Sequence, residues 1–312
     1  MSFKGANLTA NRRPGVCAKN GFSEAKSHRL LGDERGLLWQ LKPIARCPLL
    51  SGYPPDHGRA WPVVARSQCC AQGGAVHLKH DSTLAARLLR IANSAAFAQS
   101  EPVASIEDAV ALIGLRDVHR IVGAVAVDQF SLRNYPIYGF TGPRLRANAL
   151  LVALLMEELA LPAHEDVPVA YSAGLFRSLG KLALAKIADE EAPVAPFRPT
   201  DILRLVGWEK QTFGRTSNEA TAVILQEWRF PRDVMQAIAD HYSPDARSRR
   251  LVHLLNLAAH LADDLGHGLP GESAYWLDPA EFDRTSGIES LDIQHATERA
   301  VIAFDRINRA IG

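Results

Sequence analysis

The chain has 312 residues, of which 47% are hydrophobic and 22% are charged, the balance of a soluble globular protein with a well-developed core. Its 35 basic and 34 acidic residues leave a formal net charge of +1, so no global field draws it to nucleic acid or to anionic lipid. The longest apolar run, Ala149–Met156, is far shorter than the ~18 residues of a membrane span. No apolar segment follows the basic residues at the N-terminus, so no secretory signal is visible and we expect a cytoplasmic protein.

The first quarter of the chain carries few structural signals. Residues 1–45 mix Gly, Ser, Asn, Lys and Arg without apolar periodicity, which predicts a flexible arm. Residues 47–74 are rich in Pro, Gly, Cys and Arg and predict neither helix nor strand. No cysteine belongs to a C-x2-C pattern, so we expect reduced thiols rather than a metal or redox site. The cysteines are Cys17, Cys47, Cys69 and Cys70.

From Asp81 onward the apolar residues recur at helical spacing, without the alternation that is typical of strands. Ser105 and Asp108 resemble a capping box, and Pro143 and Pro231 stand where a helix can begin, because the missing N–H costs nothing there. The predicted helices are 81–97, 105–114, 115–127, 144–160, 167–188, 201–206, 217–228, 231–241, 248–265 and 293–311. We therefore predict an all-α protein, folded as a compact multi-helix bundle.

An ordered series of motifs lies along these predicted helices. The motifs are DSTLAARLLRIANS (81–94), SIEDAVALIG (105–114), AGL (173–175), LGKL (179–182), FG (213–214), EWRFP (227–231) and IADH (238–241). Together they resemble the HDOD domain, an output domain of bacterial signalling proteins that is related to the HD phosphohydrolases. We predict such a domain over 46–268, most clearly from residue 81, between the N-terminal arm and a C-terminal helical extension, 269–312, packed on the core.

This resemblance implies a fold whose enzymatic relatives hold divalent metal with His and Asp side chains and thereby activate a water against phosphate esters. HDOD proteins are generally regarded as lacking that site and as acting through protein contacts. In this sequence the resemblance places Arg177 and Ser178 at the adjacent His-Asp pair, with Ser217 where many relatives carry another His. The late Asp falls near Ala259. These four positions have lost the side chains that bind metal.

Two further positions complete the pattern. The early His would fall near Ala147-Asn148, and a second late His is replaced by Tyr242. Only His241 keeps a ligand of the usual set. One imidazole does not hold a hydrated divalent cation tightly, so we expect no catalytic residue, no bound metal and no cofactor.

The basic residues at this site leave other interpretations open. Arg177 and Lys181 are four apart and could together bind a phosphate, or Arg177 could pair with a carboxylate such as Asp166 or Glu219. A rebuilt metal site is a further alternative, because His260 and Asp264 form an i, i+4 pair and His253, His260 and His267 recur every seven residues. The enzyme alternative uses His241 with His260, Asp263 or Asp264 and would make the protein a divergent metal-dependent phosphohydrolase or cyclic-di-nucleotide phosphodiesterase.

Three basic clusters suggest nucleic acid as another partner. They are Arg116 with Arg120, Arg144 with Arg146, and Arg247–Arg250. Such side chains can contact phosphates, but acidic residues lie near the first two clusters and no reading helix is recognisable. A nucleic-acid-binding regulator is therefore the weaker alternative.

Other residues of the motifs predict structural roles. Asn93 and Ser94 can satisfy backbone groups where the first helix stops. Gly174 and Gly180 suit helix packing, while Trp228, ahead of Pro231, suits a core anchor between two helices. These interpretations add nothing catalytic to the site.

We therefore expect a non-catalytic regulatory or scaffolding module in bacterial signal transduction. Its expected partners are other signalling proteins or a second copy of the chain, and not membranes. The N-terminal third departs most from the family pattern. Either an unusual helix arrangement or a misassigned reading frame upstream of about Val76 explains its composition.

Overall fold

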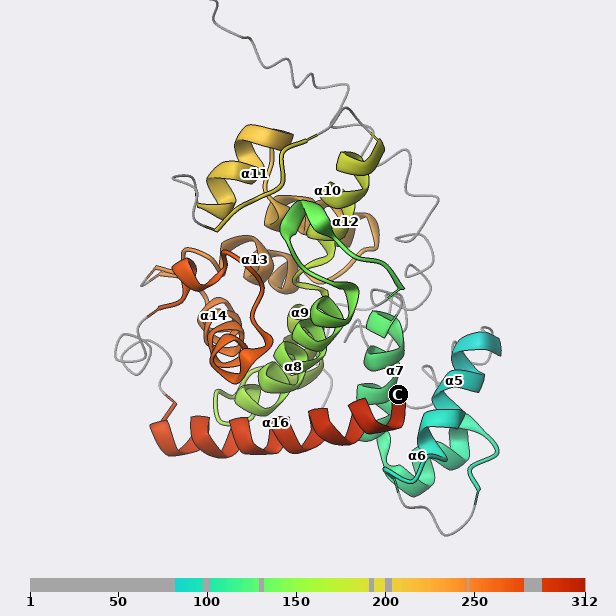
Figure 1. Cartoon of the computed structure of the whole chain (residues 1–312). Coiled ribbons are helices and arrows are strands. Elements are labelled where there is room, and N and C mark those ends of the chain that lie inside the picture. Colours follow the sequence, from blue (N-terminus) through green and yellow to red (C-terminus); the bar gives the residue numbers. More distant parts are fainter. Residues whose placement is uncertain are drawn as a thin grey trace, which may run out of the picture.

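The part of the chain that the structure describes is built from helices (Figure 1). The structure is a computed structural model, and it describes residues 82–97, 102–128, 132–190, 194–199, 204–245, 247–277 and 288–311. Within these ranges, β pairing is limited to the isolated bridge between Tyr135 and Phe140, which confirms the predicted all-α fold. The predicted arm, 1–45, and all four cysteines lie outside the described residues.

The helices follow one another with short connections. In chain order they are α5 (Ser82–Ala92), α6 (Ile106–Ile113), α7 (Leu115–Asp128), η2 (Pro136–Tyr138), α8 (Gly142–Ala160), α9 (Val167–Phe176), α10 (Leu179–Glu190), α11 (Leu205–Phe213), α12 (Ser217–Glu227), α13 (Arg232–Asp240), α14 (Arg250–Ala262), η3 (Asp263–His267), η4 (Ser273–Tyr275) and α16 (Ser290–Ile311). None of them has both the length and the apolar character that crossing a membrane demands, as far as the described residues go.

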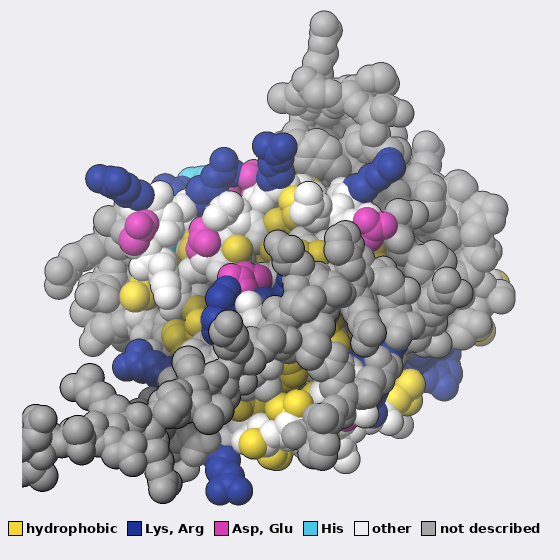
Figure 2. Space-filling view, turned by 90° about the horizontal axis from the view of Figure 1, so that it is seen from above, with side chains coloured by type: hydrophobic (Ala, Val, Ile, Leu, Met, Phe, Trp, Pro, Cys, Tyr) yellow, Lys and Arg dark blue, Asp and Glu magenta, His cyan; other side chains and the backbone are white. Residues whose placement is uncertain are grey.

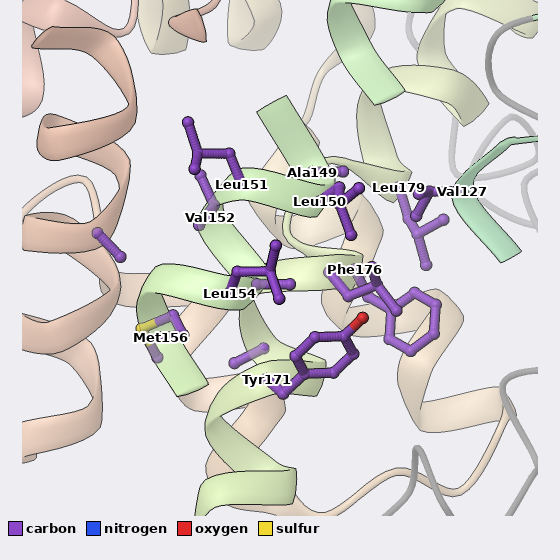
Figure 3. Packing of buried hydrophobic residues seen from close by; sticks show 14 of the residues in the cluster. Val127, Ala149, Leu150, Leu151, Val152, Leu154, Met156, Tyr171, Phe176 and Leu179 are labelled. Carbon is purple, nitrogen blue, oxygen red and sulfur yellow. The ribbon is translucent and has the colours of Figure 1, made fainter. Parts of the chain in front are cut away.

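Helix α8 forms the centre of the bundle, and α9, α14 and α16 pack on it (Figure 1). It starts at the N-cap Thr141, whose hydroxyl accepts a hydrogen bond from the Arg144 N–H. Its apolar residues surround the whole helix, the pattern of a helix buried on every side. Figure 3 shows Leu150 and Leu154 of α8 and Phe176 of α9 among the residues of the buried cluster. Each such buried side chain stabilises the fold by about 1.5–3 kcal/mol.

Two glycines allow helices to approach closely. A Cβ atom on Gly174 would lie 2.7 Å from the Ala153 Cα, where α9 crosses α8. A Cβ atom on Gly180 would lie 1.9 Å from the Ser217 carbonyl oxygen, where α10 meets α12. Only glycine fits without a shift of the backbone at these crossings.

Gly180→Ala is expected to destabilise the protein by about 3 kcal/mol, because the added methyl group overlaps a backbone carbonyl that cannot rotate away. The clash outweighs the gain of about 1 kcal/mol in helix propensity. Urea unfolding followed by circular dichroism measures the change. A variant at least as stable as the wild type would contradict the close contact between α10 and α12.

The single helix predicted over 167–188 is wrong: the chain turns at Arg177-Ser178 and divides it into α9 and α10. Thr221 of α12 stabilises this turn, because its hydroxyl oxygen accepts a hydrogen bond from the Gly180 N–H at 2.8 Å. The Thr221 hydroxyl also lies 3.3 Å from the Arg177 carbonyl oxygen and 2.9 Å from that of Ser217. The break thus depends on a tertiary contact, and apolar periodicity carries no signal for it.

Other predicted helices also have different bounds. The helix predicted over 201–206 overlaps α11 only at its last two residues, because α11 begins at Leu205 and ends where Gly214 takes a left-handed conformation, with φ of 75°. The helix predicted over 248–265 is α14, which stops at Ala262 and gives way to the wider turn η3. Gly266, with φ of 82°, ends that turn and directs the chain back over the bundle.

Helix α16 runs along the base of the bundle and ends near the group formed by α5, α6 and α7 (Figure 1). Its buried face is mostly alanine, which lets it lie close to α8. Charged residues reinforce the contact: Arg299 of α16 donates to the buried Glu158 of α8 at 2.8 Å, and Arg306 donates to Asp117 of α7 at 2.6 Å. Helix α16 therefore joins α7 to α8.

Candidate functional site

The residues that the sequence analysis placed at the metal-ligand positions of the HD phosphohydrolases lie mostly in one buried cluster. The Nη2 atom of Arg177 donates to Asn148 Oδ1 at 2.6 Å, and the other terminal nitrogen, Nη1, lies 3.4 Å from His241 Nε2. Ser217 joins through Lys181, whose Nζ donates to the Ser217 hydroxyl at 3.3 Å. These five side chains come from α8, the turn between α9 and α10, α10 itself, α12, and the end of α13.

Glu272 is the centre of the cluster. Its Oε2 accepts a hydrogen bond from Arg177 at 2.9 Å, and its Oε1 accepts one from the Tyr242 hydroxyl at 2.6 Å. Lys181 Nζ is 3.1 Å from the same Oε1. All four side chains are buried, so these charges are compensated by one another instead of by water.

The carboxylate partner predicted for Arg177, Asp166 or Glu219, is therefore wrong. Asp166 caps α9 by accepting a hydrogen bond from the Val169 N–H, and Glu219 binds Lys210. Glu272 is 95 positions from Arg177 along the chain, and spacing along one helix cannot indicate such a partner.

The electrostatics of the cluster fix Glu272 as an anion. Burial alone would raise the pKa of the Glu272 carboxyl, but Arg177 and Lys181, together with the hydrogen bond from Tyr242, outweigh it and lower the pKa to about 2. Burial acts against the charge of Arg177 as well, yet Glu272 raises the pKa of the guanidinium above its ordinary value. Both groups stay charged at neutral pH.

His241 is neutral in this environment. Burial, and then the positive charge of Arg177, lower the pKa of the imidazole to about 3. Its Nδ1 lies 2.8 Å from the Ile238 carbonyl oxygen and therefore carries the proton that is donated there. The other ring nitrogen, Nε2, is left as an acceptor for Arg177. The lone pair that would bind a metal ion is thus directed to a guanidinium.

A second buried carboxylate adjoins the cluster. Glu209 of α11 accepts hydrogen bonds from the Ser217 N–H at 2.7 Å and from the Tyr138 hydroxyl at 3.0 Å. Lys181 Nζ lies 5.8 Å from the centre of the Tyr138 ring. Two buried cations, Arg177 and Lys181, therefore share one region of the core with two buried carboxylates.

A divalent cation does not fit these residues. Arg177 and Lys181 bring positive charge to the place where it would bind, and the one imidazole there uses both of its ring nitrogens. Ala259 is a buried part of the α14 helix, without a ligand atom in its side chain. In the described ranges, no three His, Cys, Asp or Glu residues come together as a group that could hold a metal ion.

Segment 268–277 carries Glu272 into the cluster and is held on both sides. The Asn256 side chain of α14 donates to the carbonyl oxygens of His241 at 2.7 Å and of Tyr275 at 2.9 Å. The ring of Tyr242 stacks on Tyr275, with 4.7 Å between centroids. Gly271 takes φ of 80°, a conformation that lets the chain turn directly before Glu272.

The alternative metal ligands of α14 and η3 have other partners. His260 Nε2 is 3.6 Å from Asp264 Oδ2, and the Asp264 side chain is 67% exposed. Asp263 accepts a hydrogen bond from the Trp276 ring at 3.0 Å, while His253 binds the Asp245 carbonyl oxygen. None of these contacts, which all lie within the described residues, involves His241.

Most arginines of the basic clusters bind groups within the protein. Arg116 and Arg120 both bind the buried carboxylates of α8, and Arg144 donates to the Gly268 carbonyl oxygen at 2.7 Å. Arg249 pairs with Asp233, and Arg250 donates to the Ala163 carbonyl oxygen at 2.7 Å. On the face seen in Figure 2, acidic side chains stand among the basic ones.

The motif residues outside the cluster have structural contacts. The Asn93 amide donates to the Val103 carbonyl oxygen at 2.8 Å and accepts from the Val103 N–H at 2.7 Å. The Ser94 and Ser178 hydroxyls are buried without a hydrogen-bond partner among the described residues. Trp228 packs edge-on against Phe176, with 6.4 Å between ring centroids. Pro231 is the N-cap of α13, so that helix begins one residue later than predicted.

Glu272, Glu209 and Tyr138 are the site residues that the sequence analysis missed. A charge count offers the one usable signal: Arg177 and Lys181 stand among apolar neighbours in the sequence, so buried carboxylates must lie nearby. That count does not identify which carboxylates they are, because nothing in segment 268–277 marks Glu272 as buried.

Several solved structures share this fold. An HDOD domain protein with unknown function from Geobacter sulfurreducens has 19% sequence identity and a TM-score of 0.55, with 88% of this chain and 91% of that chain covered. A protein provisionally named a signal transduction protein, from Marinobacter aquaeolei, has 19% identity and a TM-score of 0.60, with 92% and 64% covered. A provisionally named phosphohydrolase from Shewanella amazonensis has 22% identity and a TM-score of 0.55, with 89% and 98% covered.

At these identities the likeness shows the fold alone, and a comparison with the curated proteins gives no match. A match to a protein-family model identifies the family of the chain. The model of the HDOD domain matches residues 63–244, more than half of the chain, and this range holds Arg177, Ser217 and His241. The chain belongs to the HDOD domain family.

Proposed function

We propose that the protein is a non-catalytic HDOD module that regulates bacterial signal transduction by binding other proteins in the cytoplasm. One observation carries this proposal: the guanidinium of Arg177, which the sequence resemblance places at the His-Asp pair of the HD phosphohydrolases, is neutralised by Glu272 at 2.9 Å. A buried, paired cation at that position leaves a divalent metal ion neither room nor ligands.

The rest of the cluster supports the same conclusion. A metal-dependent hydrolase needs a metal-bound water whose pKa the metal lowers. Here Arg177, Lys181, His241, Tyr242 and Glu272 are all buried and bound to one another. The fold keeps the helices of the hydrolase relatives, while the side chains at the former site hold those helices together.

We expect protein purified without chelator to contain far less than one metal ion per chain and to turn over neither cyclic-di-GMP nor generic phosphate esters. Elemental analysis and a phosphate-release assay measure these quantities. His241→Ala is the matched control, because it removes the one remaining ligand of the usual set. Near-stoichiometric metal, with turnover that His241→Ala abolishes, would overturn the proposal in favour of a divergent phosphohydrolase.

The partner is identified by using the intact chain as bait, with cross-linking before purification and mass spectrometry after it. We expect one or a few signalling proteins, or a second copy of the chain, to be recovered reproducibly. Recovery that is limited to nucleic acid and lost steeply with added salt would instead support a nucleic-acid-binding regulator.

A further inference from the structure

The Glu272 carboxylate is held like a bound ligand. Its contacts come from Arg177, Lys181 and Tyr242, which belong to separate elements and lie 30 to 95 positions away along the chain. We propose that these three residues form a binding site for a small oxyanion, a carboxylate or a phosphate, which Glu272 occupies as a built-in ligand and from which a free oxyanion can displace it. This proposal rests on the proposed function, because a metal ion and the Arg177 guanidinium cannot share the position.

The three donors are held in place by residues other than Glu272. Arg177 is bound by Asn148 at 2.6 Å, and Lys181 by the Ser217 hydroxyl at 3.3 Å. The Tyr242 ring lies beside the His241 ring, with 4.3 Å between centroids, and 5.5 Å from Lys181 Nζ. The donors would therefore keep their positions if the carboxylate left, as the donors of an anion site must.

The site also has a donor that Glu272 does not use. Arg177 Nε is buried and has no hydrogen-bond partner among the described residues, although the terminal nitrogens of the same guanidinium are engaged. An arginine side chain recognises oxyanions through several N–H groups at once. A phosphate has more oxygen atoms than the carboxylate of Glu272, so it could engage this additional N–H.

The charge balance of the cluster gives a reason why a free anion could replace Glu272. With Glu272 in place, the two cations Arg177 and Lys181 face two carboxylates, Glu272 and Glu209. Without Glu272 the cluster carries one excess positive charge in a buried environment, which a bound anion would neutralise. Displacement would free segment 268–277, which also contacts α11, because the Tyr275 hydroxyl accepts a hydrogen bond from the Val206 N–H at 2.9 Å. Ligand binding at the cluster would thus change an exposed part of the protein surface.

The test uses the full chain with Glu272→Ala, titrated with formate, acetate and inorganic phosphate in calorimetry and thermal-shift measurements. We expect the variant to bind at least one of these anions about 100-fold more tightly than the wild type, because no tethered carboxylate competes. The matched control is the double variant Arg177→Met, Glu272→Ala, in which we expect that binding to be lost. Tighter binding of phosphate than of formate or acetate would identify phosphates as the natural class, and the reverse order would identify carboxylates.

A second variant covers the case in which Glu272→Ala does not fold in plain buffer. Glu272→Gln keeps the side-chain volume and removes the charge, so we expect it to bind phosphate more tightly than the wild type. Equal anion affinity in the wild type, Glu272→Gln and the double variant would overturn the proposal. The metal content of the same wild-type sample separates the two hypotheses, since stoichiometric metal contradicts the proposed function, whereas metal-free protein that ignores anions contradicts only the anion site.

Discussion

Glu272→Ala is expected to lower the free energy of unfolding by about 3–5 kcal/mol, the cost of leaving buried charges without their partner. In the variant, Arg177 and Lys181 stay buried, at 2% and 1% exposed, but have one carboxylate fewer to neutralise them. Urea unfolding monitored by circular dichroism measures the loss. Asp233→Ala is the matched control, because Asp233 also pairs with an arginine but its side chain is 57% exposed, so we expect a loss of at most about 1 kcal/mol.

A double-mutant cycle shows whether the loss comes from the ion pair itself. Arg177→Met combined with Glu272→Ala removes both charges of the pair, so we expect the double variant to be less destabilised than the sum of the two single variants. Strictly additive losses, or a Glu272→Ala variant no less stable than Asp233→Ala, would show that the pair is not the principal stabilising contact of the cluster.

Acidification from pH 6.5 towards pH 3 is expected to remove roughly 4 kcal/mol of stability through His241 alone, because the pKa of this histidine falls from 6.5 to about 3 on folding. In that range His241 is protonated in the unfolded chain and neutral in the folded chain. The free energy of unfolding therefore falls by about 1.4 kcal/mol for each pH unit of acidification. Glu272 acts in the same direction at lower pH, between its ordinary pKa of 4.5 and about 2.

His241→Asn isolates this contribution, since an amide does not take up a proton. Urea unfolding at a series of pH values between 6.5 and 4.5 should give a shallower loss of stability for the variant than for the wild type. His295→Asn is the control, because the exposed His295 of α16 is surrounded by water in both states. Parallel pH profiles for the wild type and His241→Asn would mean that His241 is not held in its neutral form.

Much of the fold could be predicted because local signals and packing agree. Ser105 does cap α6, through a hydrogen bond from the Asp108 N–H, and Gly114 does end that helix with φ of 86°. The turn at Arg177-Ser178 could not be predicted, since the apolar spacing continues through it and the residue that stabilises it, Thr221, belongs to another helix. Helix periodicity describes which residues are buried, and says little about where a tertiary contact interrupts the helix.

The candidate site likewise contains residues that the sequence indicates and others that it does not. The family pattern indicates Arg177, Ser217 and His241. In the structure Arg177 contacts His241, and Lys181 contacts Ser217. Glu272 lies beyond residue 244, where the match to the HDOD family ends. The carboxylate that neutralises Arg177 therefore comes from a part of the chain that the family model does not cover, and only three-dimensional contacts could identify it.

Helix α16 has a consequence for how the protein folds while it is being synthesised. Its bonds to α7 and α8 join residues 189 and 141 positions apart, and such distant contacts form late. The ribosome adds about 5–20 residues per second, so α8 exists for several seconds before Arg299 is made. During that interval Glu158 lacks one of its arginines, and the alanine face that covers α8 is absent. The nascent chain therefore exposes apolar surface of its central helix until α16 docks, and that interval is when a chaperone would be needed.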